Sequence, residues 1–387
     1  MIMSDLVLRK FLIPEFIFGI DARKLAGHYA RNLGAGMVFI VTDINIIASG
    51  WVDDITMALR EENIPFIIFS NVSPNPRDTE VMNGAQLYKL HKCDVIIAVG
   101  GGSVIDCAKG VGIVASNFKH ILSYEGVDRI AVPMPPLICV PTTGGSSADV
   151  SQFAIINNTV DRLKIAIISK SLVPDIALVD PVTLTTLNPL LSAYTGIDAM
   201  VHAIEAYVSN ASSVFTDMHA IKAIELINTH LIDSINQPQN MELKSKIMLG
   251  SLHAGLAFSN ASLGCVHSMA HSLGGYLDIP HGLCNAILLP HVIEFNYNAA
   301  PEKYNEISKI IGYSKSINSQ KLKRKMLLEA VNRLVIASGI DFSLRDVGVK
   351  TENIPNLANK AIKDPCNATN PRMPVINDLE VIYKEAF

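Results

Sequence analysis

The sequence has little of what marks nucleic acid-binding, membrane and exported proteins. Lys and Arg supply 32 residues against 36 Asp and Glu, the net charge is −4, and no basic tract stands out. A nucleic acid partner is not expected, because binding a polyanion needs a concentrated basic face. No stretch reaches the roughly 18 apolar residues of a membrane helix. Residues 1–10 lack the apolar run and cleavage site of a signal peptide. We therefore expect a cytoplasmic protein with no membrane partner.

Cysteines are few and form no close pair. The six cysteines are Cys93, Cys107, Cys139, Cys265, Cys284 and Cys366. In a chain of this size such scatter indicates reduced, buried thiols rather than a disulfide framework or a thiolate zinc site. This usage agrees with the expected cytoplasmic location.

The length and the pattern of the first half predict an α/β domain. At 387 residues the chain is too long for one compact core, so two domains are expected. In the first half, apolar runs of strand length alternate with segments of helix length, which is typical of a parallel sheet covered on both faces. The expected strands are 37–43, 65–70, 94–99, 137–140 and 176–179, and the expected helices include 46–62 and 79–89. We assign residues 1–186 to this domain.

The second half predicts an all-α domain over residues 187–387. From Thr185 onward the apolar positions recur at spacings of three and four, the period of a helix, and strand-like runs almost vanish. The clearest expected helices are 190–208, 220–235, 243–258 and 322–337. Eight of the eleven histidines lie between His202 and His291, so chemistry that needs imidazole is expected in this half.

A glycine-rich turn in the first half indicates a phosphate site. Gly100-Gly101-Gly102-Ser103 follows an expected strand and opens an expected helix, where free N–H groups favour an anion. The alternative is a tight turn without a ligand. The turn lacks the third glycine of the usual dinucleotide fingerprint, and the acidic candidate for a ribose contact, Asp43, precedes it. A second loop of small residues, 141–148, could close over the same ligand.

Paired side chains in the second half suggest a metal site. Asp198 and His202 are four residues apart, as are His267 and His271, so each pair shares one helix face. His281 follows in the next turn after a glycine pair. A carboxylate and several imidazoles suit Fe²⁺ or Zn²⁺, between which the ligand types do not choose. Taken singly, each histidine is more often a core or surface residue.

In order along the chain, these motifs resemble the iron-containing (group III) alcohol dehydrogenases, which include lactaldehyde reductases and 1,3-propanediol dehydrogenases. The resemblance covers nearly the whole chain. It runs through residues 42–43, 74–76, the turn at 100–103, the loop at 141–149, 196–202, 258–264, 266–271, 280–282, 285–291 and 369–372. It implies an N-terminal dinucleotide-binding α/β domain with a parallel sheet and an all-α C-terminal metal-binding domain, with metal and nicotinamide meeting in the cleft between them.

The resemblance also implies roles for individual residues. The four implied metal ligands are Asp198, His202, His267 and His281. The implied NAD contacts are Asp43, Asn75, Gly101, Gly102, Ser103, Thr142, Thr143, Ser146 and Lys164. Asp43 would bind the adenosine ribose and repel the extra phosphate of NADP. His271 would lie beside the metal and carry a proton, although a packing role is an equal alternative.

The expected function is hydride exchange between NAD and a small primary alcohol, diol or aldehyde. One divalent cation is expected, and the family name favours Fe²⁺ over Zn²⁺. One loop departs from the family pattern Pro-Thr-Thr-Ala-Gly-Thr-Gly-Ser-Glu, since residues 141–149 read Pro-Thr-Thr-Gly-Gly-Ser-Ser-Ala-Asp. The departure affects the expected cofactor affinity. A homo-oligomer is expected, but its size, the alcohol and the physiological direction stay open.

Three other functions are alternatives. A glycerol dehydrogenase-like enzyme differs only in substrate. A dehydroquinate synthase-like lyase needs a basic cluster at the metal, whereas the ligand segments here carry residues such as Ala199, Met200 and Ala270. A catalytically silent metal-binding or scaffolding protein would not need a phosphate turn together with a metal set.

Overall fold

The computed structural model describes residues 10–312 and 319–387, and they form two compact units. One unit comprises residues 13–187, and the other comprises residues 188–387 together with residues 10–12. The first nine residues, on which the expectation about a signal peptide rests, lie outside the described residues. The assignment of residues 1–186 and 187–387 to separate functional domains stays a prediction. Each unit is described by itself below.

The first unit is built on a six-stranded sheet in which every neighbouring pair of strands is parallel. The order across the sheet is β1-β9-β6-β4-β2-β3. The strands are β1 (Glu15–Phe18), β2 (Val38–Val41), β3 (Phe66–Phe69), β4 (Val95–Gly100), β6 (Leu137–Pro141) and β9 (Ile176–Val179). All five strands expected from the sequence are present. The edge strand β1, which has only four residues and is partly exposed, was not expected.

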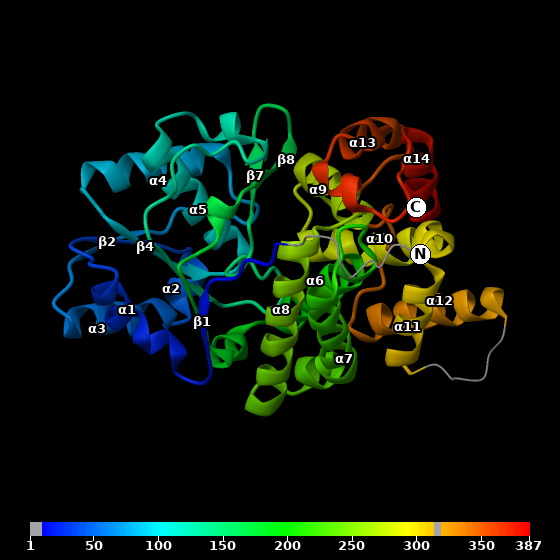
Figure 1. Cartoon of the computed structure of the whole chain (residues 1–387), viewed down its shortest axis with the longest axis horizontal. Helices are drawn as coiled ribbons and strands as arrows, with labels where there is room; N and C mark the ends of the chain where they lie inside the picture. The colour runs from blue at the N-terminus through cyan, green and yellow to red at the C-terminus, as the bar shows by residue number, and fades with distance from the viewer. Residues whose placement is uncertain (1–9, 313–318) are drawn as a thin grey trace. The chain divides into compact units, whose positions relative to one another are not determined.

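Helices cover both faces of this sheet (Figure 1). Because successive side chains of a strand point to opposite faces, β2 divides its residues between two cores. Val38 and Ile40 pack with residues of α1 (Ala26–Asn32) and α3 (Trp51–Glu61). Phe39 and Val41 pack with residues of α4 (Asp78–Leu90) and α5 (Gly102–Asn117). This double burial explains why the strands are apolar throughout.

One local prediction in this unit needs correction, and one sheet was not predicted. The expected helix 46–62 is two helices, α2 (Ile44–Ala48) and α3, because Gly50 has φ 86° and ends the first of them. A second sheet, of order β5-β8-β7, was also missed. Its strands are β5 (Gly126–Val127), β7 (Phe153–Asn158) and β8 (Leu163–Ile168), and β7 and β8 form an antiparallel hairpin.

The second unit is helical, and α6, α7 and α8 pack side by side within it (Figure 1). Its helices are α6 (Pro189–Val208), α7 (Val214–Asn236), α8 (Met241–Ala261), α9 (Cys265–Leu277), α10 (His281–Asn296), α11 (Pro301–Ile310), α12 (Gln320–Ala337), α13 (Ile354–Ala361) and α14 (Ile376–Glu385). Gly196 permits the close approach of α6 to α7, because a Cβ there would lie 2.2 Å from Leu231 Cδ1. The predicted fold class is therefore confirmed: a parallel α/β sheet followed by a helix-rich part.

Within the described ranges, no helix combines the length and the apolar character that spanning a membrane requires.

Two histidines outside the expected metal set contact each other on neighbouring helices. His219 of α7 and His253 of α8 place their Nδ1 atoms 2.8 Å apart, so one ring donates a hydrogen bond and the other accepts it. His219 also stacks on Phe11, with ring centroids 5.7 Å apart. Burial, together with the neighbouring charges of His219 and Lys222, lowers the pKa of His253 to about 4. Burial also lowers the pKa of His219, so both shifts favour the uncharged form of the pair in the folded protein.

This pair should make the fold sensitive to acid. The pKa of His253 is lowered from 6.5 to about 4, so between these values the unfolded chain binds a proton that the folded chain does not. The stability present above pH 6.5 is thus lost as the pH falls toward 4. We expect His253→Gln to reduce the drop in Tm between pH 7.5 and pH 5, measured on metal-stripped protein.

The matched control is His91→Gln, which removes an exposed histidine at the end of α4. It should leave the drop in Tm as in the wild type. An equal drop in wild type and His253→Gln would contradict the assignment.

Candidate metal and dinucleotide sites

The strand order of the large sheet has a switch point next to the expected phosphate turn. From β2 the chain moves to the edge strand β3 and then crosses back to β4, on the other side of β2. Such a switch point, at the carboxyl ends of two parallel strands, is where open α/β sheets bind ligands. Asp43 follows β2, and Gly100 is the last residue of β4. Two of the expected cofactor segments therefore flank the switch point.

The glycine turn and the small-residue loop are packed against each other. A Cβ on Gly102 would lie 2.6 Å from Cβ and Oγ of Ser146, and one on Gly101 would lie 3.0 Å from Cγ2 of Thr143. The Thr142 N–H donates to the carbonyl of Gly100 over 3.0 Å. Oγ1 of Thr142 is buried and has no hydrogen-bond partner among the described residues. The two loops therefore pack closely at the start of α5, where the free N–H groups of a helix favour an anion.

The other expected cofactor residues lie around this turn in the same unit. Asn75 has φ 61°, and its N–H donates to Oγ of Ser103 over 3.2 Å. Oδ1 of Asp43 accepts from the N–H groups of Asn45 and Ile46, so this carboxylate caps α2. Lys164 is buried on β8, where it pairs in register with Asn157. The Asn157 N–H donates to the carbonyl of Pro76, which joins this hairpin to the Asn75 loop.

The departure in the 141–149 loop has a structural consequence. Ser147 has φ 48°, in the left-handed region that favours glycine, and it stands where the family pattern has Gly. Asp149, in place of Glu, is buried, and burial raises its pKa to about 6 in spite of backbone hydrogen bonding and the charge of Lys109. Both substituted residues are buried.

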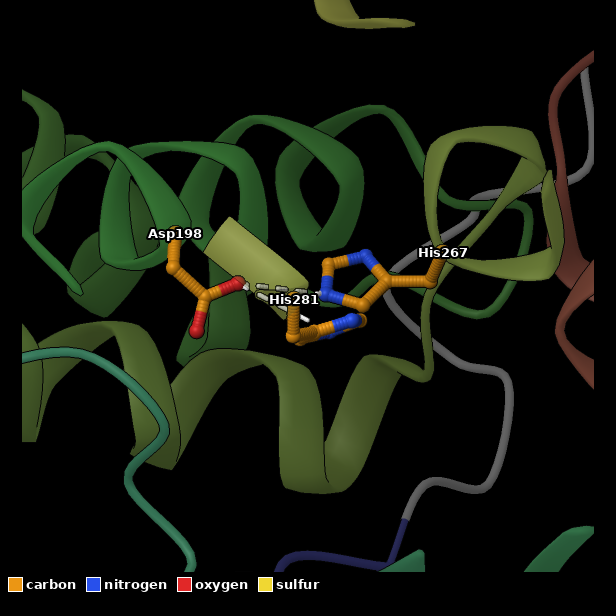
Figure 2. Close-up of side chains that lie close together, drawn as sticks. All are labelled: Asp198, His267 and His281. Atoms are coloured by element: carbon orange, nitrogen blue, oxygen red, sulfur yellow. Dashed lines mark ion pairs between the residues drawn. The ribbon is translucent and has the colours of Figure 1, made fainter. Parts of the chain in front are cut away.

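Three of the expected metal ligands converge in the helical unit (Figure 2). Asp198 comes from α6, His267 from α9 and His281 from the first turn of α10. Asp198 Oδ1 lies 3.8 Å from Nε2 of His267 and 3.8 Å from Nε2 of His281, and the three ligand atoms all lie within 4.8 Å of one another. The side chain of His267 is 1% exposed and that of His281 is 26% exposed. The open side of the group is therefore at His281.

His202, the fourth expected ligand, is placed differently. Its ring stacks between His267 and Phe258, with centroid distances of 4.5 and 4.3 Å. It does not belong to the set of three atoms that lie within 4.8 Å of one another. Its role as a ligand stays a prediction.

A buried carboxylate orients His267. Oε2 of Glu205 lies 2.7 Å from Nδ1 of His267, and the carboxylate also accepts from the N–H groups of Gly264 and Val266. With Nδ1–H donated to Glu205, the lone pair of Nε2 faces Asp198, as a ligand must. Burial raises the pKa of Glu205 to about 7, and burial together with the charge of His202 lowers that of His267.

His271 belongs to a second buried group. Its Nδ1 lies 2.8 Å from Oδ2 of Asp364, and its ring stacks on that of His281 at 5.3 Å. Burial raises the pKa of Asp364, but the charge and hydrogen bond of His271 outweigh it and bring the pKa below its usual value. Cys366 completes this group, and burial raises the pKa of its thiol well above 9. The group is thus a hydrogen-bonded His–Asp pair with a protonated thiol beside it.

Comparisons with known proteins agree with this arrangement. The model described as "Iron-containing alcohol dehydrogenase" matches residues 14–181, and that of the "Fe-containing alcohol dehydrogenase family, C-terminal" matches residues 192–387. The chain belongs to the iron-containing alcohol dehydrogenases. It is 38% identical over 380 residues to the 1,3-propanediol dehydrogenase of Citrobacter freundii, covering 97% of this chain and 98% of that one.

Two further relatives support the same family. The lactaldehyde reductase of Escherichia coli K12 is 36% identical over 372 residues, covering 96% of this chain and 97% of that one. The solved structure of a 1,3-propanediol oxidoreductase superposes with a TM-score of 0.95 at 37% identity, covering 98% of this chain and all of that one. Like its relatives, this chain is an NAD-dependent oxidoreductase of alcohols and aldehydes. The comparisons thus confirm the expected family, enzyme class and cofactors.

The ligand group of this iron-containing dehydrogenase fits a single divalent cation. Imidazole nitrogen and carboxylate oxygen at about 2.0–2.2 Å are ordinary ligands of Fe²⁺ or Zn²⁺. Two such atoms lie about 3.4 Å apart at a tetrahedral angle, and the separations of 3.8 Å observed around Asp198 are close to this. Glu205 supplies the hydrogen bond that metal-bound histidines usually make through the other ring nitrogen.

Several residues of this site were not singled out from the sequence. Glu205 lies seven residues after Asp198, on the same face of α6, and Asn285 lies four residues after His281 on α10. Helical spacing could have found both. Asp364 lies 93 residues from His271 and has no local signal.

The contact between the two loops can be tested by a double-mutant cycle. Gly102→Ala should cost about 1–3 kcal/mol because the new Cβ has no room beside Ser146. In a Ser146→Gly background the same substitution should cost clearly less, since the obstructing side chain is gone. Urea unfolding of the four proteins measures both costs. Equal costs in the two backgrounds would show that the loops do not touch as described.

Proposed function

We propose that this chain oxidises short primary alcohols or diols and reduces the corresponding aldehydes, using NAD(H) and one divalent cation, Fe²⁺ rather than Zn²⁺. The observation that carries the proposal is the convergence of Asp198, His267 and His281 in a chain of this family. The relatives are named for 1,3-propanediol and lactaldehyde, which are small and uncharged, and this supports the substrate class. A glycerol dehydrogenase-like preference would change only the substrate.

We assign the cation to Asp198, His202, His267 and His281. A cation held there supplies a Lewis acid for the substrate oxygen. Glu205 holds Nδ1–H of His267, so the ring keeps Nε2 toward Asp198. His281 lies at the exposed side of the group, where a small substrate can enter. The helices fix these side chains, so orientation is settled before substrate binds.

NAD accepts the hydride. We assign its binding site to residues 1–186, the proposed cofactor domain. Gly101, Gly102 and Ser103 offer backbone N–H groups at the start of α5 for the pyrophosphate. Thr142, Thr143 and Ser146 close over the turn, and the buried, unpaired hydroxyl of Thr142 is available to the cofactor. Asn75 and Lys164 complete the site. The carboxylate of Asp43, at the switch point, favours the ribose hydroxyls of NAD and repels the additional phosphate of NADP.

His271 is the proposed proton carrier, a role that rests on its pairing with Asp364. Because Nδ1 of His271 lies 2.8 Å from the carboxylate, Nδ1–H is donated there and Nε2 is the atom that exchanges a proton. The carboxylate fixes the ring plane in the manner of other His–Asp pairs. Asp364 is thus a positioning residue for His271.

We further propose that the enzyme works in the cytoplasm as a homo-oligomer. The first part rests on the six free, buried cysteines, a usage typical of proteins from a reducing compartment. The second rests on the family alone.

Activity of metal-stripped protein reloaded with Fe²⁺ or Zn²⁺ tests the function directly. With a panel of short primary alcohols and diols, we expect metal-dependent NADH formation, read as absorbance, and at least tenfold less with NADP, since Asp43 opposes its phosphate. His267→Ala should lose most of its bound metal. His230→Ala, on α7 of the same unit, is the matched control and should keep it.

Full metal content in purified His267→Ala would remove the ligand assignment. If the protein binds metal and NAD but shows no turnover in either direction, a lyase-like enzyme or a catalytically silent protein would be favoured instead.

His271→Ala tests the proton path. Loss of a positioned acid–base group lowers kcat by about 10²–10⁴-fold. If His271 only packs beside the site, added base should not restore kcat in the variant. We expect the lower kcat to be partly restored by imidazole in the assay, with metal content unchanged. Unaltered kcat in His271→Ala would leave this residue a packing role only.

A further inference from the structure

Lys109, in the middle of α5, is a completely buried lysine. Its Nζ donates to the backbone carbonyls of Ser151 and Phe153, each over 2.8 Å, and to Oγ of Ser151 over 3.4 Å. A buried ammonium group is unfavourable unless hydrogen bonds replace its water. These contacts therefore fix the lysine, and they equally fix the stretch of chain that it contacts, just after the 141–149 loop.

The two carbonyls lie on the outer edge of β7, which is the edge strand of the order β5-β8-β7. The carbonyl of Gln152 accepts from the Ser169 N–H over 3.0 Å, on the side of β8. Alternate residues of an extended chain direct their backbone groups to opposite edges. The carbonyls of Ser151 and Phe153 therefore face away from β8, and Lys109 takes the place of a neighbouring strand.

One face of α5 contacts the whole segment from the loop into β7. Gly102, Asp106 and Lys109 follow at helical spacing, so they share this face. A Cβ on Gly102 would lie 2.6 Å from Ser146, and one turn later Oδ2 of Asp106 accepts from the N–H of Ile155 over 3.2 Å. Lys109 follows in the third turn. This face thus fixes residues 146–155 relative to the glycine turn.

Lys109 itself lies away from the turn proposed to bind the pyrophosphate. It comes seven residues after Gly102, which is about 10 Å further along the helix axis. Its three N–H groups have three acceptors on Ser151 and Phe153. We propose that Lys109 is a positioning residue for NAD, which keeps the 141–149 loop packed on the glycine turn by holding the chain where that loop ends. The inference rests on the proposed NAD site.

The same anchor bears on a second proposed cofactor contact. β7 pairs with β8, on which Lys164 lies opposite Asn157. Because Lys109 and Asp106 bind the outer edge of β7, they also fix the hairpin that carries Lys164. Loss of Lys109 should therefore weaken cofactor binding through both the loop and the hairpin, and leave the metal ligands of the helical unit unaffected.

Lys109→Met tests this role, because it keeps the length of the side chain and removes its donors. In protein reloaded with Zn²⁺, we expect the Kd for NAD, measured by calorimetry, to rise about tenfold. Such a rise corresponds to a closed loop in about one molecule in ten. KM for NAD should rise by the same factor. The kcat at saturating NAD and the Zn²⁺ content should stay near those of wild type, because bound NAD selects the closed loop.

Hydrogen exchange measures the loop directly. Without NAD, the amides of residues 142–155 should exchange faster in Lys109→Met than in wild type. Saturating NAD should remove most of this difference. Equal exchange in the two proteins without NAD overturns the inference.

Lys244→Met is the matched control. Lys244 is a buried lysine of α8 in the helical unit, and its Nζ donates to the backbone carbonyl of Ser234 over 2.9 Å. The substitution should lower Tm, as Lys109→Met does, but leave Kd and KM for NAD unchanged. If Lys109→Met does not fold, Asp106→Ala removes the contact of a less buried residue on the same face and is judged by the same measurements.

A lower Tm with unchanged Kd for NAD in Lys109→Met gives this lysine a role in stability alone and overturns the inference. Gly101→Asp separates this result from a failure of the NAD site, since it puts a negative charge into the turn proposed for the pyrophosphate. NAD binding by Gly101→Asp as tight as by wild type overturns the site, and the inference with it. Weaker binding there, together with unchanged Kd in Lys109→Met, overturns the inference alone.

Discussion

The buried charge of Asp198 is the constraint on which the helical unit depends. A carboxylate removed from water costs several kcal/mol unless partners replace its hydration. Asp198 is 5% exposed; the amide of Asn285 donates a hydrogen bond to its Oδ1, and the Nε2 atoms of His267 and His281 lie 3.8 Å from the same oxygen. Each of these comes from a helix other than α6, so α9 and α10 must be held in register with it. Glu205 adds a second buried carboxylate that bonds the start of α9 through Gly264 and Val266. The polar group thus dictates how the helices pack.

In the sheet unit the main constraint is space at the glycine turn. Its candidate site consists largely of backbone at the ends of strands, where the approach of an anion is limited by side-chain bulk rather than by charge. A Cβ on Gly102 would displace Ser146, and one on Gly101 would press on the side chain of Thr143, so the sequence there is restricted by space. The loop itself tolerates a strained residue, Ser147, because its neighbours are buried and fix its backbone. The proposed metal ligands thus lie on helices, and the proposed phosphate contacts lie in close-packed turns at the ends of strands.

Much of this could be predicted from the sequence, and the exceptions have physical reasons. Continuous apolar runs such as 94–99 identify strands buried on both faces, and spacings of three and four identify α6, α7, α8 and α12. The hairpin of β7 and β8 was missed because its strands end in polar residues such as Asn157 and belong to a separate small sheet. Spacing brought Asp198 and His267 into the candidate set. It could not place the ring of His202, which depends on stacking against Phe258, nor find Asp364, which only tertiary packing brings to His271.

The same packing bears on the choice between a dehydrogenase of small alcohols and a lyase acting on a phosphorylated, carboxylated substrate. An anionic substrate would need cationic side chains beside the ligands, and these would have to be buried with their own partners. The residues next to the ligands on α6 and α9 are instead small or apolar and completely buried: Ala199, Ala203, Met269 and Ala270. The electrostatics of this unit therefore favour a neutral substrate such as an alcohol or aldehyde, whose oxygen needs only the cation.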